Sequence, residues 1–319
     1  MHPLTRRCFM ASSVSAGVVA WATGSKADDS NAAEPIIDIH QHTTYRARTP
    51  EQLLAHQRAM GVTQTILLPA GSSVKRASTG DGKHNTLGGV GAGGNDTALA
   101  MARQNPREFY FGANEVTDLA DARNEIAKYL ELGGIIIGEQ KFAVECDSKE
   151  SQSLYELAAE FNVPILMHFQ HGTYNMGFER LHTMLVKYPK TIFIGHAQTW
   201  WANIDQNHPD QNMLYPKGKV TAGGLTDRYL ADYPNAFADM SAGSGLNALT
   251  RDEDHARGFL DRHQDKVLYG SDCDDRVGNG AACQGSQTIA AVRRLSVNKA
   301  VERKILYENA KKLFRLPNV

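Results

Sequence analysis

Eight short apolar runs, separated by segments with helical patterning, are the feature that most restricts how this 319-residue chain can fold. Within each run the apolar residues are continuous, which is typical of strands buried on both faces of a parallel sheet. Eight such strands alternating with helices predict a single-domain (β/α)8 TIM barrel of the α/β class, with a doubly wound sheet as the alternative. The runs lie at residues 35–40, 65–69, 109–112, 135–138, 164–168, 191–196, 235–239 and 266–272.

Helices are predicted between these runs from apolar spacing and end signals. Thr49 and Pro50 suit the N-cap and first position of a helix at 51–60, and Gly133 follows a helix at 118–132. The remaining predicted helices cover 96–104, 151–161, 178–188, 252–263, 286–295 and 299–313.

The first 27 residues are typical of an export signal. Arg6 and Arg7 precede a mildly apolar run at 11–23, and a small-residue pattern ends at Ala27. The paired arginines resemble a twin-arginine signal, so we expect a periplasmic or extracellular protein; an uncleaved anchor or an ordinary disordered N-terminus is the alternative. The expected division of the chain is a signal peptide at 1–27, a linker at 28–34 and the barrel at 35–319.

The expected mature chain carries little net charge. Removing residues 1–27 takes away Arg6, Arg7 and Lys26 and no acidic residue, which leaves 31 basic and 35 acidic side chains. Without a basic excess, we expect no binding to nucleic acid, and no stable membrane span remains after cleavage. The expected partner is a small-molecule substrate, and a homo-oligomer is compatible with the sequence.

Three cysteines remain after the expected cleavage, namely Cys146, Cys273 and Cys283. An odd number allows at most one disulfide bridge in an oxidising compartment. The spacing of Cys273 and Cys283 is not that of a zinc finger, so the sequence predicts structural roles for these thiols.

One glycine-rich segment, 71–94, separates the second apolar run from the next helix. It contains eight glycines, but no strand precedes its G-x-G-x-x-G match, so it is not a dinucleotide-binding loop. In a barrel, a loop that follows a strand lies at the catalytic face. The segment is therefore either a mobile lid or a disordered insertion.

Ionisable residues recur where the apolar runs end, which is the strongest functional signal. His40 and His42 are two positions apart on the first strand and therefore share a side. His168, His196 and Asp272 end the fifth, sixth and eighth runs. In a barrel these ends converge at one mouth, and imidazole with carboxylate suits a divalent metal ion of the zinc type. The sequence therefore predicts a metal site there.

With these motifs, the chain from Pro35 to Leu316 resembles the amidohydrolase superfamily, specifically the amidohydrolase-related branch that also holds aminocarboxymuconate-semialdehyde decarboxylase. The resemblance implies a distorted (β/α)8 barrel with one catalytic divalent metal ion, most often zinc. The implied metal ligands are His40, His42, His168 and Asp272, of which Asp272 is also catalytic. His196 is the second implied catalytic residue, holding or deprotonating the water or stabilising the oxyanion.

Two further residues near the end of the fourth strand could complete the site. In binuclear members of the superfamily a carboxylated lysine at this point bridges two metal ions, which makes Lys141 a candidate bridge. Glu139 shares its face and could bridge instead. Lys141 could equally bind an anionic substrate or form an ion pair. Gln198, Trp200 and Asp239 are weaker candidates for the substrate pocket.

The expected function is hydrolysis of an ester, lactone or amide bond in a small molecule by metal-activated water. Non-oxidative decarboxylation, as in the decarboxylases of this branch, uses nearly the same ligands and is the alternative reaction. A non-catalytic periplasmic metal- or solute-binding barrel is the alternative of another class.

Export by the twin-arginine route depends on both arginines. Replacing Arg6 and Arg7 together with lysine is expected to abolish delivery of the mature protein to the periplasm of a bacterial host, measured by cell fractionation. Unchanged delivery would contradict the twin-arginine interpretation.

Overall fold

The computed structural model of the protein describes residues 34–71 and 86–318. The predicted signal at 1–27 and nearly all of the linker at 28–34 lie outside the described residues, so both remain predictions. Among the helices that the structure describes, none combines the length and the apolar character needed to cross a bilayer.

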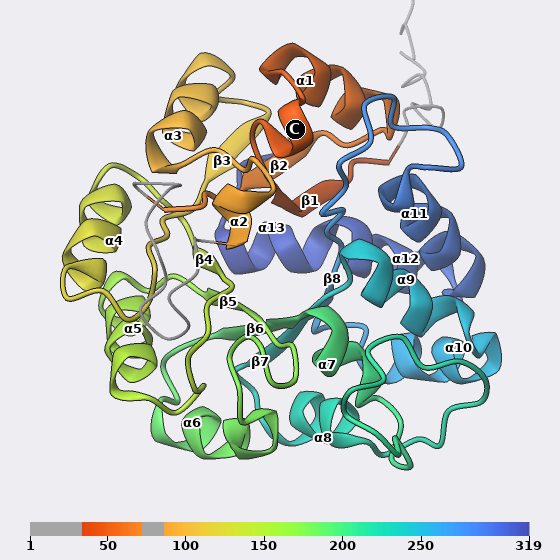
Figure 1. The fold of residues 1–319 in the computed structure, drawn as a ribbon. Coiled ribbons are helices and arrows are strands. Elements are labelled where there is room, and N and C mark those ends of the chain that lie inside the picture. Colours follow the sequence, from red (N-terminus) through yellow and green to blue (C-terminus); the bar gives the residue numbers. More distant parts are fainter. Residues whose placement is uncertain (1–33, 72–85, 319) are drawn as a thin grey trace, which may run out of the picture. The chain divides into compact units, whose positions relative to one another are not determined.

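Eight strands occur in the places of the eight apolar runs (Figure 1). Every pairing between neighbouring strands is parallel, in two sheets with the orders β1-β2-β3 and β4-β5-β6-β7-β8. The strands are β1 (Ile37–Gln41), β2 (Gln64–Leu67), β3 (Phe109–Phe111), β4 (Ile137–Gln140), β5 (Ile165–His168), β6 (Phe193–His196), β7 (Ala236–Asp239) and β8 (Val267–Leu268).

Backbone hydrogen bonds just outside these strands join the two sheets into a ring. Between β3 and β4, Ala113 pairs with Ile137 in a parallel bridge. Between β8 and β1, the Asp272 amide donates to the His40 carbonyl at 2.8 Å. The ring is thus closed but irregular at two seams. This confirms the predicted distorted (β/α)8 barrel of a single domain and excludes a doubly wound sheet.

The helices surround the ring, except that α13 lies across it (Figure 1). Short 3₁₀ turns are η1 (Tyr45–Ala47) and η2 (Phe178–Arg180), and η3 (Lys304–Glu308) is a π-helical turn. The α-helices are α1 (Pro50–Ala59), α2 (Thr86–Gly89), α3 (Asn95–Gln104), α4 (Ala122–Glu131), α5 (Lys149–Phe161), α6 (Leu181–Lys187), α7 (Ala197–Ala202), α8 (Leu225–Asp232), α9 (Ala242–Thr250), α10 (Glu253–Arg262), α11 (Gln284–Leu295), α12 (Lys299–Arg303) and α13 (Asn309–Phe314).

Each helix predicted from the sequence has a counterpart, and the prediction for α1 holds in atomic detail. The Thr49 side chain accepts from the Gln52 amide while the Gln52 side chain accepts from the Thr49 amide, which completes a capping box. Helices α2, α7, α8 and α9 were not predicted. In α7 nearly every residue is buried, so it has no polar face to give the alternation that identifies a surface helix.

The hydrophobic core has two layers. The larger layer lies between the strands and the outer helices. The smaller one fills the barrel, where strand residues such as Ile37, Ile66 and Ile194 pack together with Phe314 of α13. Because α13 closes one end of the ring, polar side chains can gather only at the other, where the carboxyl ends of the parallel strands meet.

The glycine-rich segment is described only in its second part. From Thr86 onward it is tied to the loop after β1, where the Thr44 hydroxyl donates to the Gly91 carbonyl at 2.8 Å. Leu87 and Ala92 are buried against Ala70. This part is therefore packed in place, and the lid hypothesis now concerns residues 72–85, which lie outside the described part.

The carboxylate of Asp38 fastens the seam between β1 and β8. Its Oδ1 accepts from the amides of His40 and Ser271 at 3.0 and 2.9 Å. Its Oδ2 accepts from the Gln57 amide group at 2.9 Å and from the Ser271 hydroxyl at 2.5 Å. A single side chain thus fixes the loop that follows the last strand onto the first strand.

Replacing Ser271 with alanine removes one of these bonds and leaves a buried carboxylate oxygen under-bonded. The expected loss in the free energy of unfolding is about 1–3 kcal/mol, measured by urea denaturation. Ser153→Ala, on the outer helix α5, is the control and should change it by less than about 0.5 kcal/mol. Equal effects of the two variants would contradict the role of this seam.

Candidate metal centre

Six ionisable side chains from five strands or strand ends meet at the carboxyl mouth of the barrel. All six are buried, although Asp272 retains 8% of its surface exposed. Three overlapping groups of these residues have ligand atoms within 4.8 Å of one another. The six residues are His40, His42, Glu139, His168, His196 and Asp272.

His40 and His42 direct the same ring nitrogen toward each other. The Nδ1 of His40 lies 2.7 Å from an Asp239 oxygen, and the Nδ1 of His42 lies 2.7 Å from the Leu68 carbonyl. Both partners are acceptors, so each Nδ1 carries a proton. The two Nε2 atoms, 3.2 Å apart, then present lone pairs to the same space when the rings are neutral. A cation in that space would satisfy both.

Glu139 lies at the centre of the group. Its Oε1 is 2.5 Å from His168 Nδ1, and its Oε2 is 3.4–3.5 Å from the Nε2 atoms of His42 and His40. It projects from β4 directly into the space shared by the histidines. The structure therefore places this carboxylate among the predicted ligands.

Four of the six residues have buried polar atoms without hydrogen bonds. Within the described residues, the Nε2 atoms of His168 and His196, Oε2 of Glu139 and Oδ1 of Asp272 have no hydrogen-bond partner. Such atoms are costly to bury unless something binds them. Together they point to a ligand that accepts several lone pairs at once.

The charges at the mouth act strongly on one another. Burial lowers the pKa of His40, but the negative charges of Asp272, Asp239 and Glu139 outweigh this and raise it well above its usual value. Burial raises the pKa of the Asp272 carboxyl, but His40 and His42 hold it far below its usual value. The Asp272 carboxyl is thus ionised at neutral pH.

The residues fit a divalent cation. Imidazole nitrogens and carboxylate oxygens are the ligands of zinc and related ions, and a cation would neutralise the buried carboxylates of Glu139 and Asp272. His40, His42, Glu139, His168, His196 and Asp272 all offer an atom to it.

Asp239 was predicted to lie in the substrate pocket, and here the structure requires a correction. One of its oxygens accepts from the Ser241 hydroxyl at 2.7 Å and faces His40, and the same oxygen is 3.3 Å from His196 Nδ1. Asp239 is fully buried. Its carboxylate therefore orients the two histidines rather than a substrate.

Ser241 was not among the site residues predicted from the sequence. Its Oγ donates to Asp239 and lies 3.0 Å from His196 Nδ1 and 3.2 Å from His40 Nδ1. Its position two residues after the end of a strand is the only signal, and serine at strand ends is too common for that to single it out.

Lys141 lies near the cluster but is not part of it. It has no hydrogen-bond or salt-bridge partner in the part of the chain that the structure describes. Burial lowers the pKa of its amine, but Glu139 and Asp272 raise it above its usual value, with smaller contributions from Tyr174 and Tyr215. The amine is therefore a cation beside the mouth. Between the two candidate bridges, the structure brings Glu139 among the histidines.

The two other pocket candidates differ in their surroundings. Gln198 is partly exposed, and its amide donates to the Tyr215 hydroxyl at 3.2 Å, while its carbonyl oxygen has no partner among the described residues. Trp200 is 1% exposed and packs on Phe169 and Phe178. Trp200 is a core residue and not a pocket wall, because its ring points away from solvent into the layer beneath α7.

A closed parallel barrel with histidines and carboxylates at its carboxyl mouth is the architecture of a metal-dependent (β/α)8 enzyme. The chain belongs to the amidohydrolase family, whose model matches residues 37–316. No protein of curated function matches the sequence.

Solved structures share the fold at low sequence identity. A probable 2-pyrone-4,6-dicarboxylic acid hydrolase from Acinetobacter baumannii is 13% identical with a TM-score of 0.55, covering 88% of this chain and 99% of its own. A dihydroxybenzoic acid decarboxylase from Polaromonas with bound manganese is 15% identical with a TM-score of 0.54, covering 90% and 98%. A 5-carboxyvanillate decarboxylase from Sphingomonas paucimobilis is 16% identical with a TM-score of 0.53, covering 86% and 85%.

The orientation of His40 by Asp239 makes a prediction for metal affinity. Asp239→Asn is expected to weaken Mn²⁺ binding by about 10- to 100-fold, because the histidine loses the carboxylate that fixes its ring. Free Mn²⁺ measured by electron paramagnetic resonance gives both affinity and stoichiometry, and we expect about one ion per chain. His182→Ala, on helix α6, is the control; equal affinities for the two variants would contradict the role of Asp239.

Proposed function

We propose that the protein is a metal-dependent hydrolase that cleaves an ester, lactone or amide bond in a small molecule carrying a carboxylate. The observation that carries this proposal is the nearly buried Asp272 carboxyl, whose Oδ1 has no hydrogen-bond partner among the described residues. Burial raises the pKa of this carboxyl, but His40 and His42 hold it far below its usual value. Hydrolysis needs a proton acceptor beside the attacking water, whereas decarboxylation needs a proton donor to carbon. An ionised carboxylate suits the first task.

His40, His42, Glu139, His168 and Asp272 would hold the ion. A divalent cation supplies polarisation of the scissile carbonyl and a lower pKa for the attacking water. We propose zinc, because imidazoles dominate the ligand set and suit it.

Asp272 accepts the proton of the attacking water and then returns it to the leaving group. His196 orients that water. Since the Ser241 hydroxyl donates to Asp239, it can only accept from His196 Nδ1, which leaves Nε2 of His196 as an acceptor. Burial, the largest influence, lowers the pKa of His196 to about 4, which keeps this nitrogen unprotonated at neutral pH.

Lys141 supports the proposal that the substrate is an acid. Its amine is charged and free of protein partners within the described residues, close enough to Asp272 for their charges to interact. A lysine in that place binds a carboxylate as a point charge. Gln198, with its unpartnered carbonyl oxygen, is a second candidate contact for substrate.

Decarboxylation is the second candidate reaction. It is favoured by the named decarboxylases among similar structures, one of which is complexed with 2,6-dihydroxybenzoate. These substrates are also acids, so Lys141 serves both reactions.

Export remains a proposal that rests on the N-terminal pattern. It is compatible with this chemistry, because the twin-arginine route carries folded proteins and would allow the metal to be bound before export.

Activity against carboxylate-bearing lactones and esters, and CO2 release from hydroxybenzoates, separates the two reactions. We expect hydrolysis, and Asp272→Asn at saturating metal should lower kcat/KM by about 10²- to 10⁴-fold. CO2 release without hydrolysis would contradict the proposal in favour of decarboxylation.

The substrate's charge has its own test. Lys141→Met should raise KM for acidic substrates by about 10- to 100-fold and leave neutral esters unaffected, because only the acids lose a charge-assisted contact. Lys128→Met, on the exposed face of α4, is the matched control. An equal effect on neutral and acidic esters would contradict carboxylate recognition by Lys141.

A further inference from the structure

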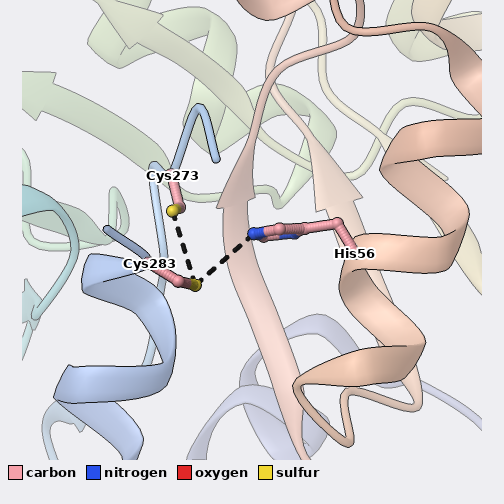
Figure 2. Close-up of side chains that lie close together, drawn as sticks. All are labelled: His56, Cys273 and Cys283. Atoms are coloured by element: carbon pink, nitrogen blue, oxygen red, sulfur yellow. Dashed lines mark hydrogen bonds between the residues drawn. The ribbon is translucent and has the colours of Figure 1, made fainter. Parts of the chain in front are cut away.

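Three side chains that the mechanism does not use meet in a second cluster. His56 projects from α1, Cys273 from the segment after β8, and Cys283 from the N-cap of α11, with the histidine facing the two thiols (Figure 2). The Cys273 and Cys283 sulfur atoms are 3.6 Å apart, and Nε2 of His56 lies 3.5 Å from the Cys283 sulfur. All three residues are fully buried.

This cluster shares no residue with the groups at the barrel mouth. Cys273 directly follows Asp272, but its sulfur faces α1 and α11, while the Asp272 carboxylate faces the histidines. Two adjacent residues of the chain therefore belong to two separate clusters.

The ligand types and their spacing fit a thiophilic ion. Thiolate and imidazole are the ligands of zinc-type ions. A tetrahedral ion with a metal–sulfur bond of about 2.3 Å places two sulfur ligands about 3.8 Å apart. The two sulfur atoms, 3.6 Å apart, are close to that separation. The 3.5 Å between His56 Nε2 and the Cys283 sulfur suits a nitrogen ligand, whose bond to the ion is shorter, about 2.1 Å. The Met60 sulfur, 3.6 Å from the Cys283 sulfur, is a fourth soft atom beside the group.

Charge and hydrogen bonding favour the same ligand. Two thiolates and a neutral imidazole balance a divalent ion, so no net charge is buried. Among the described residues, the one hydrogen-bond contact of the His56 ring joins its Nε2 to the Cys283 sulfur, so this nitrogen is placed to share an ion with that thiolate.

We propose that His56, Cys273 and Cys283 form a second metal site, which binds a thiophilic divalent ion such as zinc. The site ties α1 and α11 to the segment that carries Asp272. The Cys273 carbonyl already accepts from Gln41 and Arg48 at 2.9 and 2.8 Å. The bound ion fixes the side chain of the same residue and so acts as a positioning element for the mouth.

Cadmium titration of the full chain tests this site separately from the catalytic one. The protein is reduced, freed of metal and handled without oxygen, and the ultraviolet absorption of cadmium–thiolate charge transfer is recorded. The cluster at the barrel mouth has no sulfur ligand, so this absorption does not report on it; the other thiols of the full chain are Cys8 and Cys146. We expect it to saturate at about one equivalent of thiolate-bound cadmium per chain.

Matched variants assign the signal. Cys283→Ser should abolish the absorption, His56→Gln should weaken cadmium binding at least about tenfold with both thiols retained, and Cys146→Ser, at a remote buried thiol, should leave it unchanged. Circular dichroism confirms that each variant is folded.

Two results would overturn the proposal. One is the absence of thiolate absorption although Cys273 and Cys283 both react with a thiol reagent in the unfolded protein. The other is recovery of these two cysteines as a disulfide-linked peptide from metal-free protein purified without reductant. Failure of the catalytic proposal would leave this outcome unaffected, because the readout is independent of turnover.

Discussion

The seam between the last and the first strand is the constraint on which the rest of the structure depends. β8 has only two residues in regular pairing, so few backbone hydrogen bonds join it to β1 and the closure draws on side-chain help. The buried carboxylate of Asp38 provides it by holding both the amide and the hydroxyl of Ser271. Because His40 follows Asp38 by two residues and Asp272 follows Ser271, closing the ring also brings the two halves of the metal centre together.

At the candidate metal centre, supporting carboxylates and carboxylates that face the centre differ in their hydrogen bonding. Residues that only position others have all their oxygens engaged. Asp239 accepts from the Ser241 amide through one oxygen, and its other oxygen contacts the Ser241 hydroxyl and His40. Residues that face the centre keep free atoms, as Asp272 does. This difference separates supporting from functional carboxylates on physical grounds, since an unpaired buried oxygen costs free energy that only a ligand can return.

The sequence was sufficient to predict the eight strands, the barrel and the convergence of His40, His42, His168, His196 and Asp272, because strand ends in a parallel barrel share one mouth. It was insufficient where an outcome depends on packing. Trp200 follows His196 at the barrel mouth yet turns into the core, and Asp239 ends a strand yet binds protein partners. Ser241 and the approach of His56 to the cysteines depend on distant segments, which local patterns do not encode.

The segment between Cys273 and Cys283 is held at both ends, while residues 279–282 within it are exposed. Because both ends are anchored, a change in the length of this segment costs little free energy: doubling a flexible loop costs only about 0.6 kcal/mol. The segment follows the last strand and thus opens onto the catalytic face. A longer or different sequence could be grafted there to alter which molecules enter the barrel. The ring, the helices and both clusters would be left intact. The range of substrates can therefore change at this point without a change of fold.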